Sequence, residues 1–356
     1  MSMKFRTNTS RRHAAIGAAL VASLYACGEP SRPTAEQTPT TQSSVNQHTT
    51  PTAAPEDVPF VETPNNRARV RHLSLSMTQF TLNHELGHMV MREYGLPVLG
   101  GQEDAADRFA TLLMTPPPRQ VAGPPETFDP AVEPDVPGIL WAVAWWRFDQ
   151  RSQGPDAVPV YWGPHPLGEQ RSYQVLCLVY GADPQRFEQT ASKYLPATRL
   201  EECLDEARTN SASWEQVLAG QVMRKGELDA RYNPVVRYND APEELASARA
   251  SLMESRSLET FGESLRRLRV RPGLGRPDPA LRLQLSELAR SIQERSIPVI
   301  GDACQTPDGR YAENAFWDGN QRQIVFCYGL QRLFDQWART TISRTSIGRS
   351  EAAAPR

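Results

Sequence analysis

Two histidines four residues apart, with a glutamate directly after the first, could hold a metal ion and activate a water. They are His84, Glu85 and His88, in the pentapeptide His-Glu-Leu-Gly-His. On a helix, residues four apart lie on the same face, so both imidazoles can point at one ion. The carboxylate of Glu85 can then take a proton from a water in the open position of that ion. The motif predicts zinc-dependent hydrolysis through a Glu85-activated, metal-bound water.

A short motif can also occur in a helix that binds nothing. The chain has only six histidines among 356 residues, so a chance match to this motif is rare. Gly87 costs about 1 kcal/mol of helix propensity relative to alanine, which close packing around a metal explains better than helix stability does. Apolar residues recur at three- and four-residue spacings, as on a half-buried helix: Met77, Phe80, Leu82, Leu86, Met89 and Val90. These observations favour a metal site.

A catalytic zinc ion usually has three protein ligands, so a third ligand is needed. Residues 102–110 follow two glycines and are predicted to form a second helix, in which Glu103 and Asp107 share a face. Glu103 is the preferred ligand, and Asp107 would accept the spare N–H of a ligating imidazole. Asp104 is a rival ligand. Ordinary stabilisation of a helix N-terminus by acidic residues is the alternative explanation for both Glu103 and Asp107.

These motifs resemble a bacterial family proposed to be zinc metallopeptidases, whose function is unknown. The resemblance is carried by the following segments: 83–88, 96–100, 103–107, 168–173 and 176–184, continuing to Cys203. The pattern is also similar to the gluzincin type of zincin, in which a glutamate on the following helix is the third ligand and an aspartate four residues later supports the site. The resemblance implies a zincin-like fold that hydrolyses an unidentified peptide or protein substrate.

A further resemblance lies near the carboxyl end of the chain. Residues 314–317 and 324–328 are similar to a strand pair of the same family, where the pair precedes the metal helix. Here the pair comes long after that helix. The departure indicates either a rearranged order or a coincidence over a short segment.

Hydrolysis of a peptide bond also needs a group that stabilises the oxyanion formed when water attacks. His165, Arg171 and Tyr173 are the candidates, because they lie in the segment that resembles the family. Packing, or a hydrogen bond at the surface, is the alternative role for each.

The amino terminus resembles a bacterial export signal. Basic residues precede an apolar stretch at 14–25 that is too short to span a bilayer as a mature helix. The stretch ends at a lipobox-like sequence before Cys27, which would carry lipid after cleavage. Because Tyr25 is unusual in such a box, simple secretion is the alternative. We therefore expect a signal peptide at 1–27 and export to the bacterial cell envelope, with a lipid anchor in a membrane or a free protein in the periplasm.

Composition divides the rest of the chain. Residues 28–66 are rich in Pro, Thr, Ser and Gln, which predicts a disordered tether. We expect a zincin-like core at 67–240, a helical pair with a carboxyl-terminal hairpin packed on the core at 241–340, and a disordered tail at 341–356. The expected fold class is α+β and predominantly helical, with a small β-hairpin or sheet. A net charge of −2 gives no indication of nucleic-acid binding.

Periodicity adds detail to these boundaries. Two long amphipathic helices are predicted at 242–268 and 279–296, and Trp141 and Trp145 are predicted to be core residues. The proline-rich loop 115–138 could act as a lid.

Four further cysteines form an even set in an exported protein. Pairing Cys177 with Cys203, and Cys304 with Cys327, closes two short loops, each worth about 3 kcal/mol. A cysteine-ligated metal is the alternative, but no Cys-x-x-Cys spacing supports it. Two disulfides are therefore predicted.

Two functions are compatible with the sequence. The first is a zinc-dependent peptidase, and the second is a non-catalytic envelope lipoprotein with a structural or vestigial metal site. Glu85 favours the first, because a structural site has no use for a general base beside its ligands.

Overall fold

A computed structural model describes residues 59–93, 95–116, 137–152, 159, 161–219, 235–261 and 297–352, which all lie in the unit Thr50–Arg356. The predicted signal peptide with Cys27, most of the tether, the helix predicted at 279–296 and most of the loop 115–138 lie outside the described residues. None of the described helices combines the length and the apolar character needed to cross a membrane.

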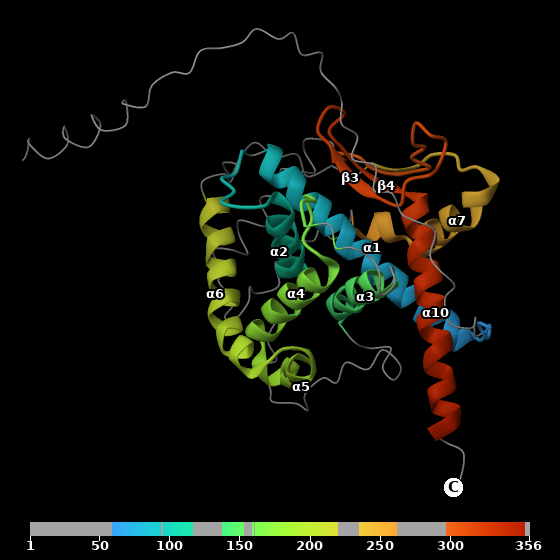
Figure 1. The fold of residues 1–356 in the computed structure, drawn as a ribbon. Coiled ribbons are helices and arrows are strands. Elements are labelled where there is room, and N and C mark those ends of the chain that lie inside the picture. The colour runs from blue at the N-terminus through green and yellow to red at the C-terminus, as the bar shows by residue number, and fades with distance from the viewer. Residues whose placement is uncertain are drawn as a thin grey trace, which may run out of the picture. The chain divides into compact units, whose positions relative to one another are not determined.

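The helix that carries the histidine motif is the longest described element. This helix, α1 (Pro64–Glu93), spans 30 residues and lies among the other elements (Figure 1). The hydroxyl of Thr63 accepts a hydrogen bond from the Asn66 backbone N–H at 3.1 Å, which satisfies one of the free N–H groups at the helix start. Apolar side chains along α1 are buried, among them Leu73, Met77, Phe80, Leu86 and Met89. A core therefore forms around α1.

The described residues form five further helices in the amino-terminal part of the fold. They are α2 (Gln102–Met114), α3 (Gly138–Ser152), α4 (Gly168–Ala182), α5 (Pro184–Tyr194) and α6 (Ala197–Ala219). Both α2 and α3 contact α1, α4 packs on α2 and α3, and α5 and α6 pack on α4. Trp141 and Trp145 are buried in this core, as predicted.

The carboxyl half contributes a small sheet and a long helix. The strands β1 (Val236–Tyr238), β2 (Val299–Asp302), β3 (Ala315–Asp318) and β4 (Gln323–Cys327) are arranged in the order β1-β2-β4-β3. The first three strands in this order are parallel, whereas β3 pairs with β4 as an antiparallel hairpin at the edge. The helix α10 (Tyr328–Ala352) follows β4 directly, and both α10 and β3 contact α1 (Figure 1). The fold is therefore α+β and predominantly helical, as expected.

Three expected boundaries need correction. The helix predicted at 242–268 is interrupted, because a 3-10 turn, η1 (Glu243–Leu245), leads into α7 (Ala246–Ser255) and Arg256 then adopts a left-handed conformation with φ 52°. This turn redirects the chain so that Leu258 and Phe261 are buried. The tail predicted at 341–356 is also wrong over most of its length. There α10 continues to Ala352, with Ile342 fully buried. Finally, α1 begins at Pro64, inside the residues assigned to the tether.

Both predicted disulfides are present. Cys177–Cys203 joins α4 to α6 across a sequence separation of 26, and Cys304–Cys327 joins the segment after β2 to the end of β4 across a separation of 23.

Replacing both Cys304 and Cys327 with serine should lower the free energy of unfolding by about 3 kcal/mol, because the unfolded chain loses a covalent restraint on loop closure. Urea-induced unfolding of the oxidised wild-type protein and the double variant measures this difference. Equal free energies of unfolding would contradict the prediction.

Candidate metal centre

Three side chains converge between α1 and α2. The Nε2 atom of His84 lies 3.1 Å from Nε2 of His88 and 3.1 Å from Oε2 of Glu103. The Nε2 atom of His88 lies 3.3 Å from the same Glu103 oxygen. Among the described residues, this is the one group of three or more histidine, cysteine and acidic side chains whose ligand atoms are close enough to share an ion. The structure thus brings the three predicted ligands together.

The distances between these donor atoms suit zinc. With metal–ligand bonds of about 2.0–2.1 Å, neighbouring ligands of a tetrahedral zinc ion are about 3.3 Å apart. The three observed separations are 3.1, 3.1 and 3.3 Å. Two imidazole nitrogens and a carboxylate oxygen that converge in this way are the donor set of a His-His-Glu catalytic zinc site. The residues therefore fit a metal ion.

Gly87 allows α1 and α2 to approach closely. A Cβ atom at this position would lie 3.0 Å from Cα of Ala106 and 3.4 Å from Cδ1 of Phe109, both on α2. The sequence suggested close packing around a metal. In the structure, the backbone of α2 takes up this space, and Glu103 lies on the same helix.

We expect Gly87→Ala to weaken zinc binding about tenfold or more, because α2 must shift and carries Glu103 with it. The free energy of unfolding should change little, since alanine gains about 1 kcal/mol of helix propensity against the crowding. Zinc titration with a competing chelator, beside urea unfolding, measures both quantities. An unchanged dissociation constant for zinc would contradict the prediction.

Asp107 links His84 to α4. Its Oδ1 lies 2.8 Å from Nδ1 of His84, and Arg171 donates from Nε and Nη2 to the two carboxylate oxygens, both at 2.7 Å. The Arg171 guanidinium also lies 4.4 Å from the ring centre of Trp146. Burial alone would raise the pKa of Asp107, but Arg171 and His84 together hold it well below its usual range. An anionic Asp107 keeps the proton of His84 on Nδ1 and leaves Nε2 free for a metal.

Glu85 is held in place by the backbone of β3. One of its oxygens, Oε2, accepts a hydrogen bond from the backbone N–H of Trp317 in β3, at 2.9 Å. Burial raises the pKa of Glu85, while His84 and His88 act in the opposite direction. A buried carboxylate with a raised pKa is a better proton acceptor than one at the surface.

The three candidate oxyanion stabilisers lie in different surroundings. His165 is half-exposed, and its Nδ1 lies 3.0 Å from Oε2 of Glu103. Arg171 directs its guanidinium at Asp107 and Trp146. The ring of Tyr173 lies 5.4 Å from the guanidinium carbon of Arg147. Of the three, His165 is the one that contacts a predicted metal ligand.

Asp104, the rival ligand, lies outside the His-His-Glu group. It lines a cavity between α2 and α6 instead.

Sequence reasoning missed two contacts of this site. One is the ion pair of Arg171 with Asp107, for which the sequence contains no spacing signal. The other is the hydrogen bond from Trp317 to Glu85. Its signal was the resemblance of 314–317 to a strand pair that accompanies the metal helix, and β3 does contact α1.

Comparison with known proteins agrees with this geometry. Residues 56–218 match the model of a family described as Putative metallopeptidase. The matched segment includes α1 and α2, and therefore the predicted ligands, Glu85 and Asp107, whereas β3 lies outside it. No curated protein and no solved structure matches the chain. Residues 56–218 of this chain are therefore similar to the family described as Putative metallopeptidase.

Proposed function

We propose that the protein is a zinc-dependent metallopeptidase, with Glu85 as general base. The observation that carries the proposal is the hydrogen bond between Glu85 and the backbone of β3. This bond places the edge of a strand, to which a peptide can pair, next to the predicted base. The match of residues 56–218 to the family model supports the same reaction class.

The outer edge of β3 offers a binding surface for a peptide backbone. The backbone N–H of Cys327 donates to the carbonyl of Asn314, and pairing alternates along an antiparallel ladder, so Phe316 also directs its backbone groups toward β4. The backbone groups of Trp317 then face away from β4, as its N–H to Glu85 shows. An extended peptide can add to such an edge through main-chain hydrogen bonds. This would place a peptide carbonyl near Glu85.

The residues of the site then divide the chemistry among them. A zinc ion held by His84, His88 and Glu103 would polarise the carbonyl and lower the pKa of a water from about 15.7 to about 7. Glu85 takes one proton from the attacking water, and the oxygen of the water bonds to the carbonyl carbon. The carbon–nitrogen bond then breaks, and Glu85 returns the proton to the leaving amine. His165, half-exposed beside Glu103, is the proposed donor to the oxyanion.

A structural or vestigial metal site explains these observations less well. A buried structural site gains nothing from a carboxylate that binds no metal, yet Glu85 is buried and fixed by a backbone N–H. His165, which lies beside Glu103, has a side chain that is 49% exposed, so solvent reaches this residue next to a predicted ligand.

We also propose that the protein is exported and anchored to a membrane by lipid on Cys27. Two disulfides support an oxidising compartment outside the cytoplasm.

The proposal predicts about one zinc per chain in the purified protein, as three protein ligands and one open position require. His84→Ala and Glu103→Ala should lose the metal, and Asp104→Asn should keep it. Elemental analysis of the three folded variants beside the wild-type protein measures this. A folded wild-type protein without zinc would contradict the proposed function, whereas zinc retained in Glu103→Ala would show that another residue is the third ligand.

A further inference from the structure

A cavity of about 750 Å³ lies between α2, α6 and the segment 96–101, on a different face of α2 from Glu103 and Asp107. This volume is in the range of sites that bind small ligands or parts of peptides. One part of the lining is apolar and includes Leu96 and Trp214, both largely buried. The remainder is polar and charged.

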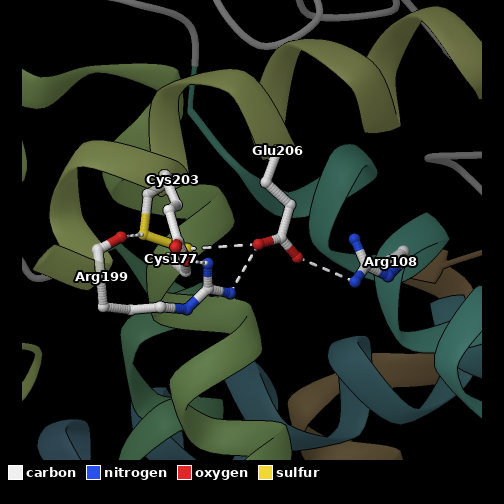
Figure 2. Close-up of a disulfide and its surroundings, with 6 residues drawn as sticks. Arg108, Cys177, Arg199, Cys203 and Glu206 are labelled. Atoms are coloured by element: carbon white, nitrogen blue, oxygen red, sulfur yellow. Dashed lines mark hydrogen bonds and ion pairs between the residues drawn. A yellow bond between two sulfur atoms is a disulfide. The ribbon is translucent and has the colours of Figure 1, made fainter.

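Two arginines in the lining are already paired. Glu206 accepts hydrogen bonds from Nη2 of Arg108 at 2.8 Å and from Nη2 of Arg199 at 2.5 Å. Figure 2 shows the two guanidinium groups reaching this carboxylate from opposite sides, next to the Cys177–Cys203 disulfide. Burial alone would raise the pKa of Glu206, but the two arginines lower it overall. The positive charges of the cavity are therefore committed to a carboxylate within the lining.

The cavity as a whole has an excess of negative charge. Four carboxylates line it against two guanidinium groups. Of the other three carboxylates, Glu202 lies 3.3 Å from Arg199, and Asp205 pairs with Arg208 at the surface. Asp104 has no ion pair among the described residues, and its Oδ1 is buried without a hydrogen-bond partner there. The unpaired charge of the cavity is thus negative and lies on α2.

A second polar group in the lining lacks a partner. Asn210 on α6 is only 6% exposed, and its amide Nδ2 has no acceptor among the described residues. A buried polar atom without a partner costs about 1–3 kcal/mol, which a ligand with a suitable acceptor would recover.

We propose that this cavity binds a peptide segment in which a basic side chain lies next to an apolar one. The ammonium or guanidinium group pairs with Asp104, and the apolar side chain packs against Leu96 and Trp214. A backbone carbonyl supplies the acceptor for Asn210. A peptide carries all three groups, whereas an inorganic cation leaves the apolar wall uncovered and an anion is repelled by the surplus carboxylates.

Binding of a labelled peptide tests this proposal independently of peptidase activity. The probe is a fluorescein-labelled hexapeptide of alternating leucine and lysine, and its matched control has glutamate in place of lysine. Anisotropy is measured with the full-length Glu85→Gln protein, in which the probe is not expected to be cleaved. Asp104→Asn is compared with Asp308→Asn, a matched change in an exposed ion pair outside the cavity lining.

We expect the lysine peptide to bind and the glutamate peptide not to bind. Asp104→Asn should weaken binding roughly tenfold or more, because a charge-assisted contact is lost. Asp308→Asn should change the affinity less than about twofold, since an exposed ion pair contributes little. Circular dichroism and zinc content confirm that the fold and the metal site of each variant are intact. Equal affinity in Asp104→Asn, equal binding of the two peptides, or no binding at millimolar peptide would overturn the proposal.

Discussion

Glu85→Gln should hydrolyse peptides about a hundredfold to ten-thousandfold more slowly than the wild-type protein, while it binds zinc with unchanged affinity. The amide of glutamine has nearly the shape of the carboxylate and can still accept the N–H of Trp317 through its oxygen. It cannot take a proton from water, which is the step that general-base catalysis accelerates. The measurement is the initial rate on a mixture of quenched fluorescent peptides, together with zinc content.

Two outcomes would contradict this assignment of Glu85. Hydrolysis at the wild-type rate would show that another group is the base. Loss of zinc would show that Glu85 is a ligand. Glu201→Gln is the matched control, because Glu201 is an exposed glutamate on α6 outside the cavity lining. Its rate should equal that of the wild-type protein.

Arg171→Met should lower the free energy of unfolding by about 3–5 kcal/mol, because it leaves the buried carboxylate of Asp107 without its bidentate partner. The same variant should bind zinc about 10–100-fold more weakly, since Asp107 no longer fixes the orientation of His84. Urea unfolding and zinc titration measure the two effects separately.

A double variant separates packing from positioning. Asp107→Leu combined with Arg171→Met replaces the buried ion pair with apolar side chains, which should recover much of the lost stability. Zinc affinity should stay low, because Nδ1 of His84 has lost its acceptor. If zinc affinity returned together with stability, the ion pair would serve packing alone.

The local parts of the site could be predicted from the sequence, because helical periodicity acts over a few residues. Spacings of four place His84 with His88, and Glu103 with Asp107, before any tertiary contact is known. The sequence Tyr94-Gly95-Leu96-Pro97 predicts that the chain turns back after the first helix, and α2 does contact α1.

Contacts between distant segments could not be predicted in this way. Arg171 and Asp107 are 64 residues apart, and no pattern in the sequence joins them. The strands β1 and β2 were missed because they have three and four residues and gain their stability from pairing in the sheet. The end of α7 was also missed. A left-handed arginine is rare, and burial of the following residues determines it here.

The order of elements along the chain has a consequence for the newly synthesised protein. Trp317 contacts Glu85 across a sequence separation of 232, so the predicted base is positioned by a segment that is made long after its own helix. A chain that ends before β3 contains every predicted metal ligand but has neither the edge strand nor the N–H that holds Glu85. On the proposed mechanism, an incomplete chain can bind zinc without being a competent peptidase. The connectivity thus delays the proposed peptidase activity until β3 has been synthesised and folded.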